Sequence, residues 1–375
     1  MAFTRFRRRR IPAPDRPVEY ANPRSKRVLR QSYELQFVIP LHKPPRLSQA
    51  FVDWYGSRRM KVDISDITVD RPIFLIGLPR SGTTVLQDII CAHPDIAYIT
   101  NAMNSNRKSF WATEALRKRL ELDFTGERFL EDGVMIGPGT ANEGHGFLLD
   151  WLGIDPWSVE TVKYDGTKMN PERRERAHET IRKVIWCFGG QRRFFMKNPG
   201  LTTHALFIRD VFPDARIIHV VRDPRMVANS LIKLFQRHRD QEAYVREVLG
   251  KPLNGQRPFV PYPRIPNLGK YIEEYGVESI QTTARVWNDA LDALDAVRDE
   301  LPCFYELRHE DLVARPEEEI GKLMRFCELE EVTDRSAPIW EKLAGLRVVP
   351  PGKQYRDYEV VEEVCGDRMR RYGYL

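Results

Sequence analysis

The stretch IFLIGLPRSGTT, residues 73–84, decides which fold this chain is expected to adopt. Its first four residues are an uninterrupted apolar run, which is typical of a parallel strand buried on both faces. Two glycines with the spacing of a phosphate-binding loop follow, and apolar residues then recur with helical periodicity over 85–90. The stretch therefore predicts a strand, a loop and a helix, with the loop at the carboxyl end of the strand.

The loop itself departs from that of the nucleotide triphosphatases, in which a lysine follows the second glycine and a hydroxyl binds Mg²⁺. Here Thr83 occupies the lysine position, and the cation lies inside the loop as Arg80. A guanidinium, the Thr83 and Thr84 hydroxyls and backbone N–H groups can still bind a phosphate. The alternative is an ordinary turn in which the two threonines cap the helix.

The rest of the chain repeats the alternation of strand and helix. Apolar strands are expected at 194–196, 216–221 and 304–307, and a helical pattern follows each of them. This order predicts an α/β fold with a P-loop-like, mostly parallel sheet flanked by helices.

The expected organisation is one domain, residues 46–375, that follows a basic, proline-rich N-terminal arm, residues 1–45. The charged segment 101–185 has a helical pattern with one glycine-rich interruption. We interpret it as an insertion that covers the sheet and carries acceptor specificity.

The composition narrows the class of protein. The chain has 375 residues, of which 42% are hydrophobic and 30% charged, as in soluble globular proteins. It lacks an apolar stretch long enough to span a bilayer and the apolar core of a secretory signal, so we expect a cytoplasmic protein. The five cysteines include no C-x-x-C pair and the eight histidines no metal-ligand spacing, so we expect no metal.

A cluster of arginines opens the chain. Residues 5–10 read RFRRRR, and the net charge of the whole chain is +6. Such a cluster can contact an anionic membrane surface, whereas the simpler interpretation is a solvated tail. Nucleic acid is not expected as a partner of the enzyme.

A second phosphate site is expected at the end of the strand 216–221. Arg222 closes that strand, and Ser230 follows eight residues later in a helix. Ligands of open α/β sheets bind at this edge, so the two side chains could hold a second phosphate. Taken singly, Arg222 could instead pair with Asp223, and Ser230 could be a surface residue. Two phosphate sites suggest a nucleotide with phosphates at its 5′ and 3′ positions.

The pair of sites resembles the two phosphate motifs of the sulfotransferases that use 3′-phosphoadenosine-5′-phosphosulfate (PAPS). The similarity continues through FFMKNPG and FPDARIIHVVRDPRMVANSL, ARVWNDAL and LRHEDLVARPEEEIGKLMRFCEL to the C-terminal segment, and it spans roughly residues 70–375. The resemblance implies that PAPS donates sulfate to a hydroxyl of a small-molecule, lipid or glycan acceptor, without a metal, and that 3′-phosphoadenosine-5′-phosphate (PAP) is the product. The donor-binding residues that it implies are Arg80, Ser81, Gly82, Thr83 and Thr84 for the 5′-phosphosulfate, Arg222 and Ser230 for the 3′-phosphate, and Lys353 over the nucleotide.

The catalytic residues are less evident. The resemblance assigns Lys197 as a cation that stabilises the charge developing during transfer. Many relatives have a histidine four residues later, where this chain has Leu201. As proton acceptor we expect Glu143, then His145, with which it shares a glycine-rich loop, and then His204.

Two other functions are compatible with parts of the sequence. One is a kinase or nucleoside triphosphatase of the P-loop class, which the absent lysine and the second phosphate site disfavour. The other is a non-enzymatic protein that binds membranes or nucleic acid through its arginine cluster.

Overall fold

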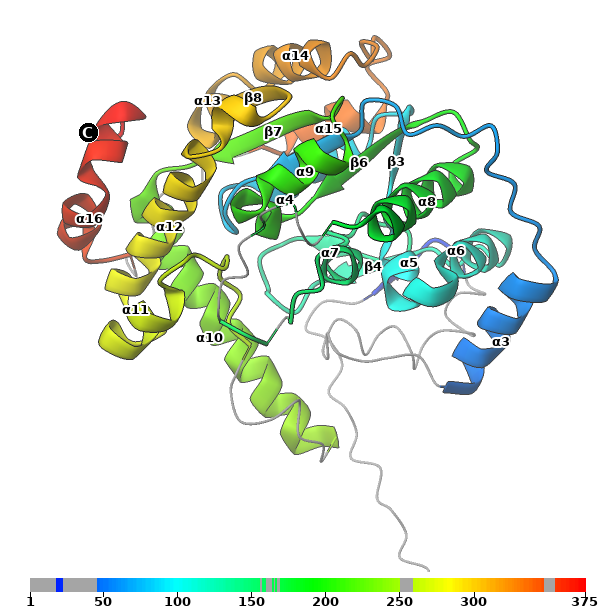
Figure 1. The fold of residues 1–375 in the computed structure, drawn as a ribbon, viewed down its shortest axis with the longest axis horizontal. Helices are drawn as coiled ribbons and strands as arrows, with labels where there is room; N and C mark the ends of the chain where they lie inside the picture. The colour runs from blue at the N-terminus through cyan, green and yellow to red at the C-terminus, as the bar shows by residue number, and fades with distance from the viewer. Residues whose placement is uncertain are drawn as a thin grey trace, which may run out of the picture.

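The computed structural model describes residues 18–22, 46–155, 157–159, 164, 166, 169–249, 259–346 and 355–375. Its centre is a five-stranded sheet with the strand order β3-β6-β2-β7-β8, in which all neighbouring strands run parallel (Figure 1). The predicted α/β fold is therefore confirmed. The strands of this sheet are β2 (Ile73–Ile76), β3 (Ile96–Tyr98), β6 (Arg193–Lys197), β7 (Arg216–Val221) and β8 (Cys303–Arg308).

Helices surround this sheet and form the bulk of the described chain (Figure 1). They are α3 (Arg46–Arg58), α4 (Thr83–Ile90), α5 (Asn101–Ser105), α6 (Phe110–Arg119), α7 (His145–Leu152), α8 (Pro171–Cys187), α9 (Ala205–Val211), α10 (Pro224–Leu249), α11 (Leu268–Tyr275), α12 (Ile280–Asp295), α13 (His309–Ala314), α14 (Pro316–Phe326), α15 (Pro338–Ala344) and α16 (Tyr358–Arg371). The short 3₁₀ helices are η1 (Arg107–Ser109), η2 (Pro199–Thr203) and η3 (Arg298–Glu300).

The central strand β2 is apolar throughout because helices cover both faces of the sheet. Phe74 and Ile76 pack in a cluster with side chains of α7, α8 and α9. Ile73 and Leu75 point the other way, into a cluster with side chains of α4, α14 and α15. All four side chains have no exposed surface. Successive strand residues point to opposite faces, so a strand covered on both sides has no position for a polar side chain.

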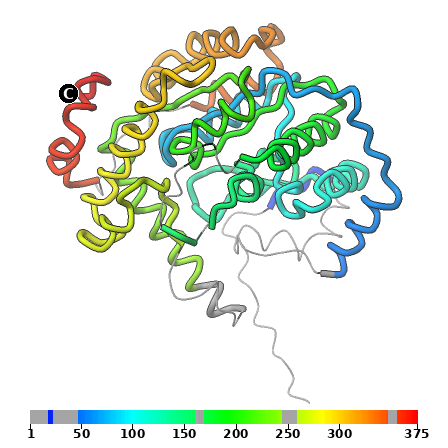
Figure 2. Tube along the Cα trace, viewed as in Figure 1, coloured from blue at the N-terminus to red at the C-terminus, as the bar shows by residue number. Residues whose placement is uncertain are grey.

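A third apolar cluster joins helices beyond the β7–β8 side of the sheet. It includes side chains of α10, α11, α12 and α16, with Trp287 fully buried among them. The tube in Figure 2 shows the C-terminal helix α16 beside α12, which lies between it and the sheet. The helix that follows β7, α10, continues to Leu249. Helix α12, which packs against it, ends at Asp295.

The segment 101–185 is only partly helical, which corrects the prediction for it. Besides helices it contains β4 (Phe124–Glu127) and β5 (Met135–Ile136), which form a small antiparallel sheet with β1 (Glu19–Tyr20). Glycines with positive φ or tight backbone contacts interrupt this part of the chain, so a helix cannot continue through it. Within the residues that the structure describes, no helix has the length and apolar character needed to cross a membrane.

Candidate active site

The glycine-rich loop connects the end of β2 with the start of α4, as predicted. Gly77 has a φ of 140°, and a Cβ there would lie 2.5 Å from the carbonyl oxygen of Val220. Gly82 has a φ of 89°, and a Cβ there would lie 2.3 Å from Nδ1 of His309. Any larger side chain would collide at both positions. The two glycines therefore let the loop pass closely between the end of β7 and the His309 ring.

Arg80 brings the two predicted phosphate sites into contact. Its Nε donates a hydrogen bond to Oγ of Ser230 at 2.9 Å, although 150 positions separate the two residues in the sequence. Arg222 donates from Nη1 to the carbonyl oxygen of Arg80 at 3.0 Å. The expected alternative for Arg222, an ion pair with Asp223, is not formed, because Asp223 pairs with Arg225. Three residues of the predicted donor site thus form one cluster.

Polar atoms without partners lie along the same loop. The hydroxyl of Ser81 and Nδ1 of His309 are buried, and neither has a hydrogen-bond partner among the described residues. The N-cap position of α4 is Gly82, so no side chain caps the N–H groups of its first turn. Unpaired donors at the start of a helix, beside two arginines, fit the phosphate groups of a nucleotide.

Lys197 is the last residue of β6 and is aligned with Leu75 of the central strand. It is only 2% exposed, and its ammonium group forms an ion pair with Glu143. Its Nζ also lies 3.4 Å from Oγ1 of Thr84, the second hydroxyl of the loop. A buried ammonium group therefore connects the loop with the predicted proton acceptor.

The electrostatics of Glu143 and His145 differ. Loss of water contact opposes the charge on Glu143, but Lys197 outweighs this effect, so the pKa of the carboxyl is lowered. Glu143 is therefore ionised at neutral pH. Desolvation by the surrounding protein lowers the pKa of His145, although the residue keeps part of its surface exposed. The backbone carbonyl of Glu143 accepts a hydrogen bond from Asn198 at 3.1 Å, which attaches this loop to the end of β6.

His204 lies in the same region, although not on the helix that follows Lys197 directly. It occupies the N-cap position of α9, after the short helix η2. Its side chain is buried, and Nδ1 lies 2.9 Å from the carbonyl oxygen of Gly200. A carbonyl can only accept, so this contact places a proton on Nδ1.

A cavity of about 680 Å³ connects these groups. Glu143, His145, His204 and Lys197 all line it, so the structure brings the four predicted residues to one space. Most of its wall is apolar and comes from the β4–β5 hairpin, α7 and the segment 259–263. The apolar side chains of this wall are Phe124, Phe129, Leu130, Val134, Met135, Ile136, Leu148, Leu149, Leu152, Ile154, Leu234, Phe259, Val260 and Tyr262.

The sequence did not indicate several polar residues that lie at this site. Asp132 accepts a hydrogen bond from Nη1 of Arg80 at 2.9 Å and forms an ion pair with Arg128. Burial opposes its ionisation, but the two arginines together lower its pKa to about 2. The spacing between Arg128 and Asp132 is typical of a local ion pair, but no pattern in the sequence connects either residue with Arg80.

Two histidines near the site, His309 and His238, were likewise not predicted from the sequence. Burial lowers the pKa of His309 to about 4, and the charge of Arg222 adds to this effect. Burial likewise lowers the pKa of His238, which lines the cavity, to about 4. Both rings are thus neutral at pH 7. Lys353 and the arginine cluster at 5–10 lie outside the described residues.

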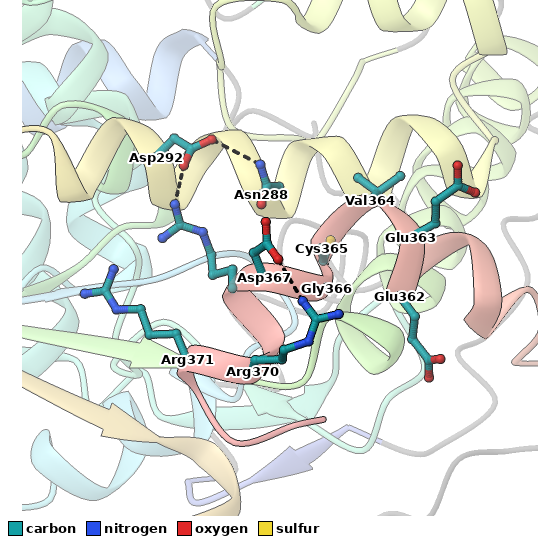
Figure 3. Close-up of a pocket in the computed structure, with 11 residues that line it drawn as sticks. Asn288, Asp292, Glu362, Glu363, Val364, Cys365, Gly366, Asp367, Arg370 and Arg371 are labelled. Carbon is teal, nitrogen blue, oxygen red and sulfur yellow. Dashed lines mark hydrogen bonds and ion pairs between the residues drawn. The ribbon is translucent and has the colours of Figure 1, made fainter.

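Another hollow, of about 580 Å³, lies between α12 and α16, away from the strand ends (Figure 3). Four of its charged side chains are paired with one another: Arg368 with Asp292, and Arg370 with Asp367. We assign no chemistry to it. The described residues contain no group of three or more His, Cys, Asp or Glu side chains that could hold a metal ion.

Comparisons with known proteins agree with a phosphate-binding site at the glycine-rich loop. The sequence model described as "Sulfotransferase family" matches residues 72–252, which include the loop, Lys197, Arg222 and Ser230. The omega-hydroxy-beta-dihydromenaquinone-9 sulfotransferase Stf3 of Mycobacterium bovis and that of Mycobacterium tuberculosis are each 23% identical to the chain over 325 residues, which are 82% of this chain and 76% of the relative.

Solved structures with similar folds are sulfotransferases as well. STF9 from Mycobacterium avium has a TM-score of 0.53 and 14% sequence identity, over 85% of this chain and 81% of the other. STF1 from Mycobacterium tuberculosis has a TM-score of 0.49 and 16% identity, over 84% and 80%. The similarity to STF9 supports the fold alone. The sequence matches to the family model and to the Stf3 proteins support the activity. Residues 72–252 thus match the sulfotransferase family, and the sequence matches support an enzyme that transfers a sulfuryl group.

Proposed function

We propose that this enzyme uses PAPS as its sulfuryl donor and transfers the group to a hydroxyl of an apolar, lipid-like acceptor. The observation that carries the donor assignment is the contact of Arg80 with Ser230 and Arg222, directly beside the glycine-rich loop. One nucleotide with phosphates at its 5′ and 3′ positions would engage the whole cluster. The family match adds to this argument, because PAPS use is general in that family.

Different residues of the donor site would bind different groups of the donor. The loop, with the N–H groups of α4 and the hydroxyls of Ser81, Thr83 and Thr84, would hold the 5′-phosphosulfate. Arg222 and Ser230 would hold the 3′-phosphate. The donor supplies the activated sulfuryl group. Lys197, 3.4 Å from the Thr84 hydroxyl, would stabilise the charge that develops near the 5′-phosphate during transfer.

Glu143 is the proton acceptor that we favour, because its ion pair with Lys197 couples it to the donor site. While that ion pair persists, the lowered pKa makes Glu143 a weak base. A bound sulfuryl group competes for the same ammonium group, since one lysine cannot neutralise both anions fully. Donor binding would therefore raise the pKa of Glu143 and turn it into a better base for the acceptor hydroxyl. His145 is the second candidate and His204 the third.

The acceptor assignment depends on the cavity wall and on one relative. The apolar side chains around the cavity favour an acceptor with little polarity apart from its hydroxyl. The Stf3 proteins, by their name, act on an omega-hydroxy dihydromenaquinone, which is a hydroxylated lipid. Contact between the arginine cluster at 5–10 and an anionic membrane would suit such an acceptor, and it stays a prediction because those residues are not described.

A transfer assay with isotopically labelled PAPS and a long-chain alcohol as acceptor tests the activity. The double variant Arg222→Ala, Ser230→Ala should lose at least ~100-fold in kcat/KM, since two direct phosphate contacts are removed. The matched control is Arg335→Ala, Ser336→Ala, an exposed arginine and serine away from the strand ends. PAP affinity that survives the first double variant would refute the donor site. Magnesium-dependent ATP turnover without sulfuryl transfer would favour the kinase alternative.

The base assignment has a separate test. Glu143→Gln should reduce kcat far more than His145→Asn does. The pH profile of kcat reports the enzyme with bound donor, and the pH profile of kcat/KM reports the free enzyme. If donor binding releases Glu143 from Lys197, the acidic limb of the kcat profile should lie at higher pH than that of the kcat/KM profile in the unchanged enzyme. Equal activity of Glu143→Gln and the unchanged enzyme would exclude Glu143 as the base.

A further inference from the structure

Helix α3 exposes a row of large apolar side chains. Leu47, Phe51 and Trp54 are 86%, 55% and 47% exposed. They are half of the six large hydrophobic side chains that are exposed in the described part of the chain. Their spacing of four and then three residues places them on one face of the helix. We call this face, Leu47, Phe51 and Trp54, the apolar row.

The opposite face of α3 attaches the helix to the rest of the protein. Nε2 of Gln49 donates to Oδ1 of Asn106 at 3.3 Å, and Nδ2 of Asn106 donates to Oδ1 of Asp53 at 3.3 Å. Gly56 is buried against α6, where a Cβ would lie 2.8 Å from Cβ of Ala112. The helix thus turns polar residues and a glycine inward and apolar residues outward. This is the reverse of a helix that packs on an apolar core.

The charges around the apolar row are mainly positive. Residues 46–61 contain four basic residues and one acidic residue, Asp53, and that carboxylate faces η1 and is 22% exposed. Arg58, Arg59 and Lys61 are exposed, and the guanidinium of Arg59 lies 6.0 Å from the centre of the Trp54 ring. Arginines beside leucine and aromatic side chains are typical of helices that lie in the interface of an anionic bilayer.

The position of α3 relates the apolar row to the acceptor cavity. The helix packs on η1 and α6, and Figure 1 shows it beside α6 at the edge of the molecule. Arg107, the first residue of η1, lines the cavity together with Asn104 and Ser105 of α5. The same part of the fold therefore supports the apolar row on one side and contributes to the cavity wall on the other.

We propose that α3 is an interfacial helix that docks the enzyme on an anionic lipid bilayer through the apolar row and the surrounding basic residues. The binding itself depends only on the composition and exposure of α3. Its purpose rests on the proposed lipid-like acceptor, because docking would place the cavity close to a bilayer in which that acceptor is dissolved.

Co-sedimentation of the full chain with vesicles, without donor or acceptor, tests the proposal. Vesicles of phosphatidylglycerol and phosphatidylcholine should bind the protein, and pure phosphatidylcholine vesicles should bind it much less. The triple variant Leu47→Ser, Phe51→Ser, Trp54→Ser should weaken binding at least ~10-fold, because three apolar side chains no longer enter the interface. Arg58→Gln with Arg59→Gln should weaken it too and reduce its salt dependence.

The matched control is Val85→Ser with Leu375→Ser, which removes exposed apolar side chains elsewhere and should leave vesicle binding unchanged. Because the substituted side chains are exposed, all variants should keep the melting temperature of the unchanged protein.

Three outcomes would overturn the proposal: wild-type protein that ignores phosphatidylglycerol vesicles, a triple variant that binds as well as wild type, and binding lost only when residues 1–15 are deleted. A dimer in sedimentation velocity that the triple variant converts to a monomer would also overturn it, since the apolar row would then be an interface between two copies. Vesicle binding without any sulfuryl transfer would refute the proposed function and leave the docking intact.

Discussion

Asp132 determines the charge that surrounds Arg80. Two cations, Arg80 and Arg128, share this single carboxylate, whose pKa is about 2, so it is ionised at neutral pH. The carboxylate therefore cancels part of the positive potential that an anionic donor would meet at the loop. It also holds the β4–β5 hairpin, which forms one wall of the cavity, against the loop.

Substitution of Asp132 separates these two effects. Asp132→Asn keeps the shape of the side chain and removes its charge, so we expect the KM for the donor to fall by roughly 3- to 10-fold. We also expect the free energy of unfolding to fall by about 1–3 kcal/mol, because two partly buried arginines lose their counter-ion. Donor titrations and urea unfolding measure the two effects.

The control for Asp132 is Asp367→Asn, since Asp367 pairs with Arg370 on the surface and should affect neither quantity. A higher donor KM in Asp132→Asn would show that the carboxylate orients Arg80 for the donor rather than weakening the attraction.

His238 makes stability depend on pH. Its folded pKa of about 4 lies below the ordinary value of 6.5, so between these values the unfolded chain binds a proton that the folded protein does not. The stabilising contribution of the neutral ring is complete above pH 6.5 and is lost as the pH falls toward 4. Each pKa unit corresponds to ~1.4 kcal/mol, and partial solvent contact reduces it, so we expect a loss on the order of 2 kcal/mol.

Urea unfolding at pH 7 and pH 4.5 measures this effect. His238→Asn cannot titrate, so its free energy of unfolding should change less between the two pH values than that of the unchanged protein. Equal changes in both proteins would mean that the ring does not contribute to the pH dependence.

At the scale of elements, the loop that connects β2 with α4 needs a glycine at position 82 for two reasons: the left-handed backbone conformation there and the short distance to the His309 ring. Gly82→Ala introduces a methyl group at a φ of 89° and directs it at the His309 ring. Gly189 offers a matched control, because it has a φ of 100° and a Cβ there would meet nothing within 4 Å. We expect both alanine variants to lose about 1 kcal/mol of stability, since both force a left-handed conformation.

Only Gly82→Ala should also lose affinity for PAP, because the loop or the His309 ring must move. Calorimetric titration with PAP distinguishes the two variants. If Gly189→Ala weakens PAP binding as much, backbone strain alone explains the effect, and the close approach to His309 has no role.

At the scale of the whole molecule, a ligand that binds several strand ends should stabilise the fold as a unit. The loop after β2 and the residues after β7 belong to neighbouring strands of one sheet. PAP at 100 times its dissociation constant should add about 2.7 kcal/mol to the free energy of unfolding. Adenosine 5′-monophosphate at the same concentration lacks the 3′-phosphate and should stabilise far less. Thermal unfolding with each ligand measures the difference, and equal shifts would argue against a second phosphate site.

Much of this architecture follows from local sequence. The apolar run of β2 and the glycine spacing after it predict strand, loop and helix, because burial on both faces and tight turns restrict which residues are allowed. The same reasoning predicted β6, β7 and β8 in their order. It failed for 101–185, where charged helical patterns on either side concealed the short strands β4 and β5.

The sequence by itself determined β2, β6, β7 and β8, the helices that follow them and the side chains that end these strands, because these depend on neighbours a few residues apart. Only the tertiary structure decided which of those side chains meet. Arg80 bonds to Ser230 across 150 positions, Asp132 to Arg80 across 52, and Lys197 to Glu143 across 54. Such pairs arise from the strand order β3-β6-β2-β7-β8 and from the hairpin that folds over the strand ends. Periodicity cannot encode them, since it records which face a residue occupies and not which distant segment packs against that face.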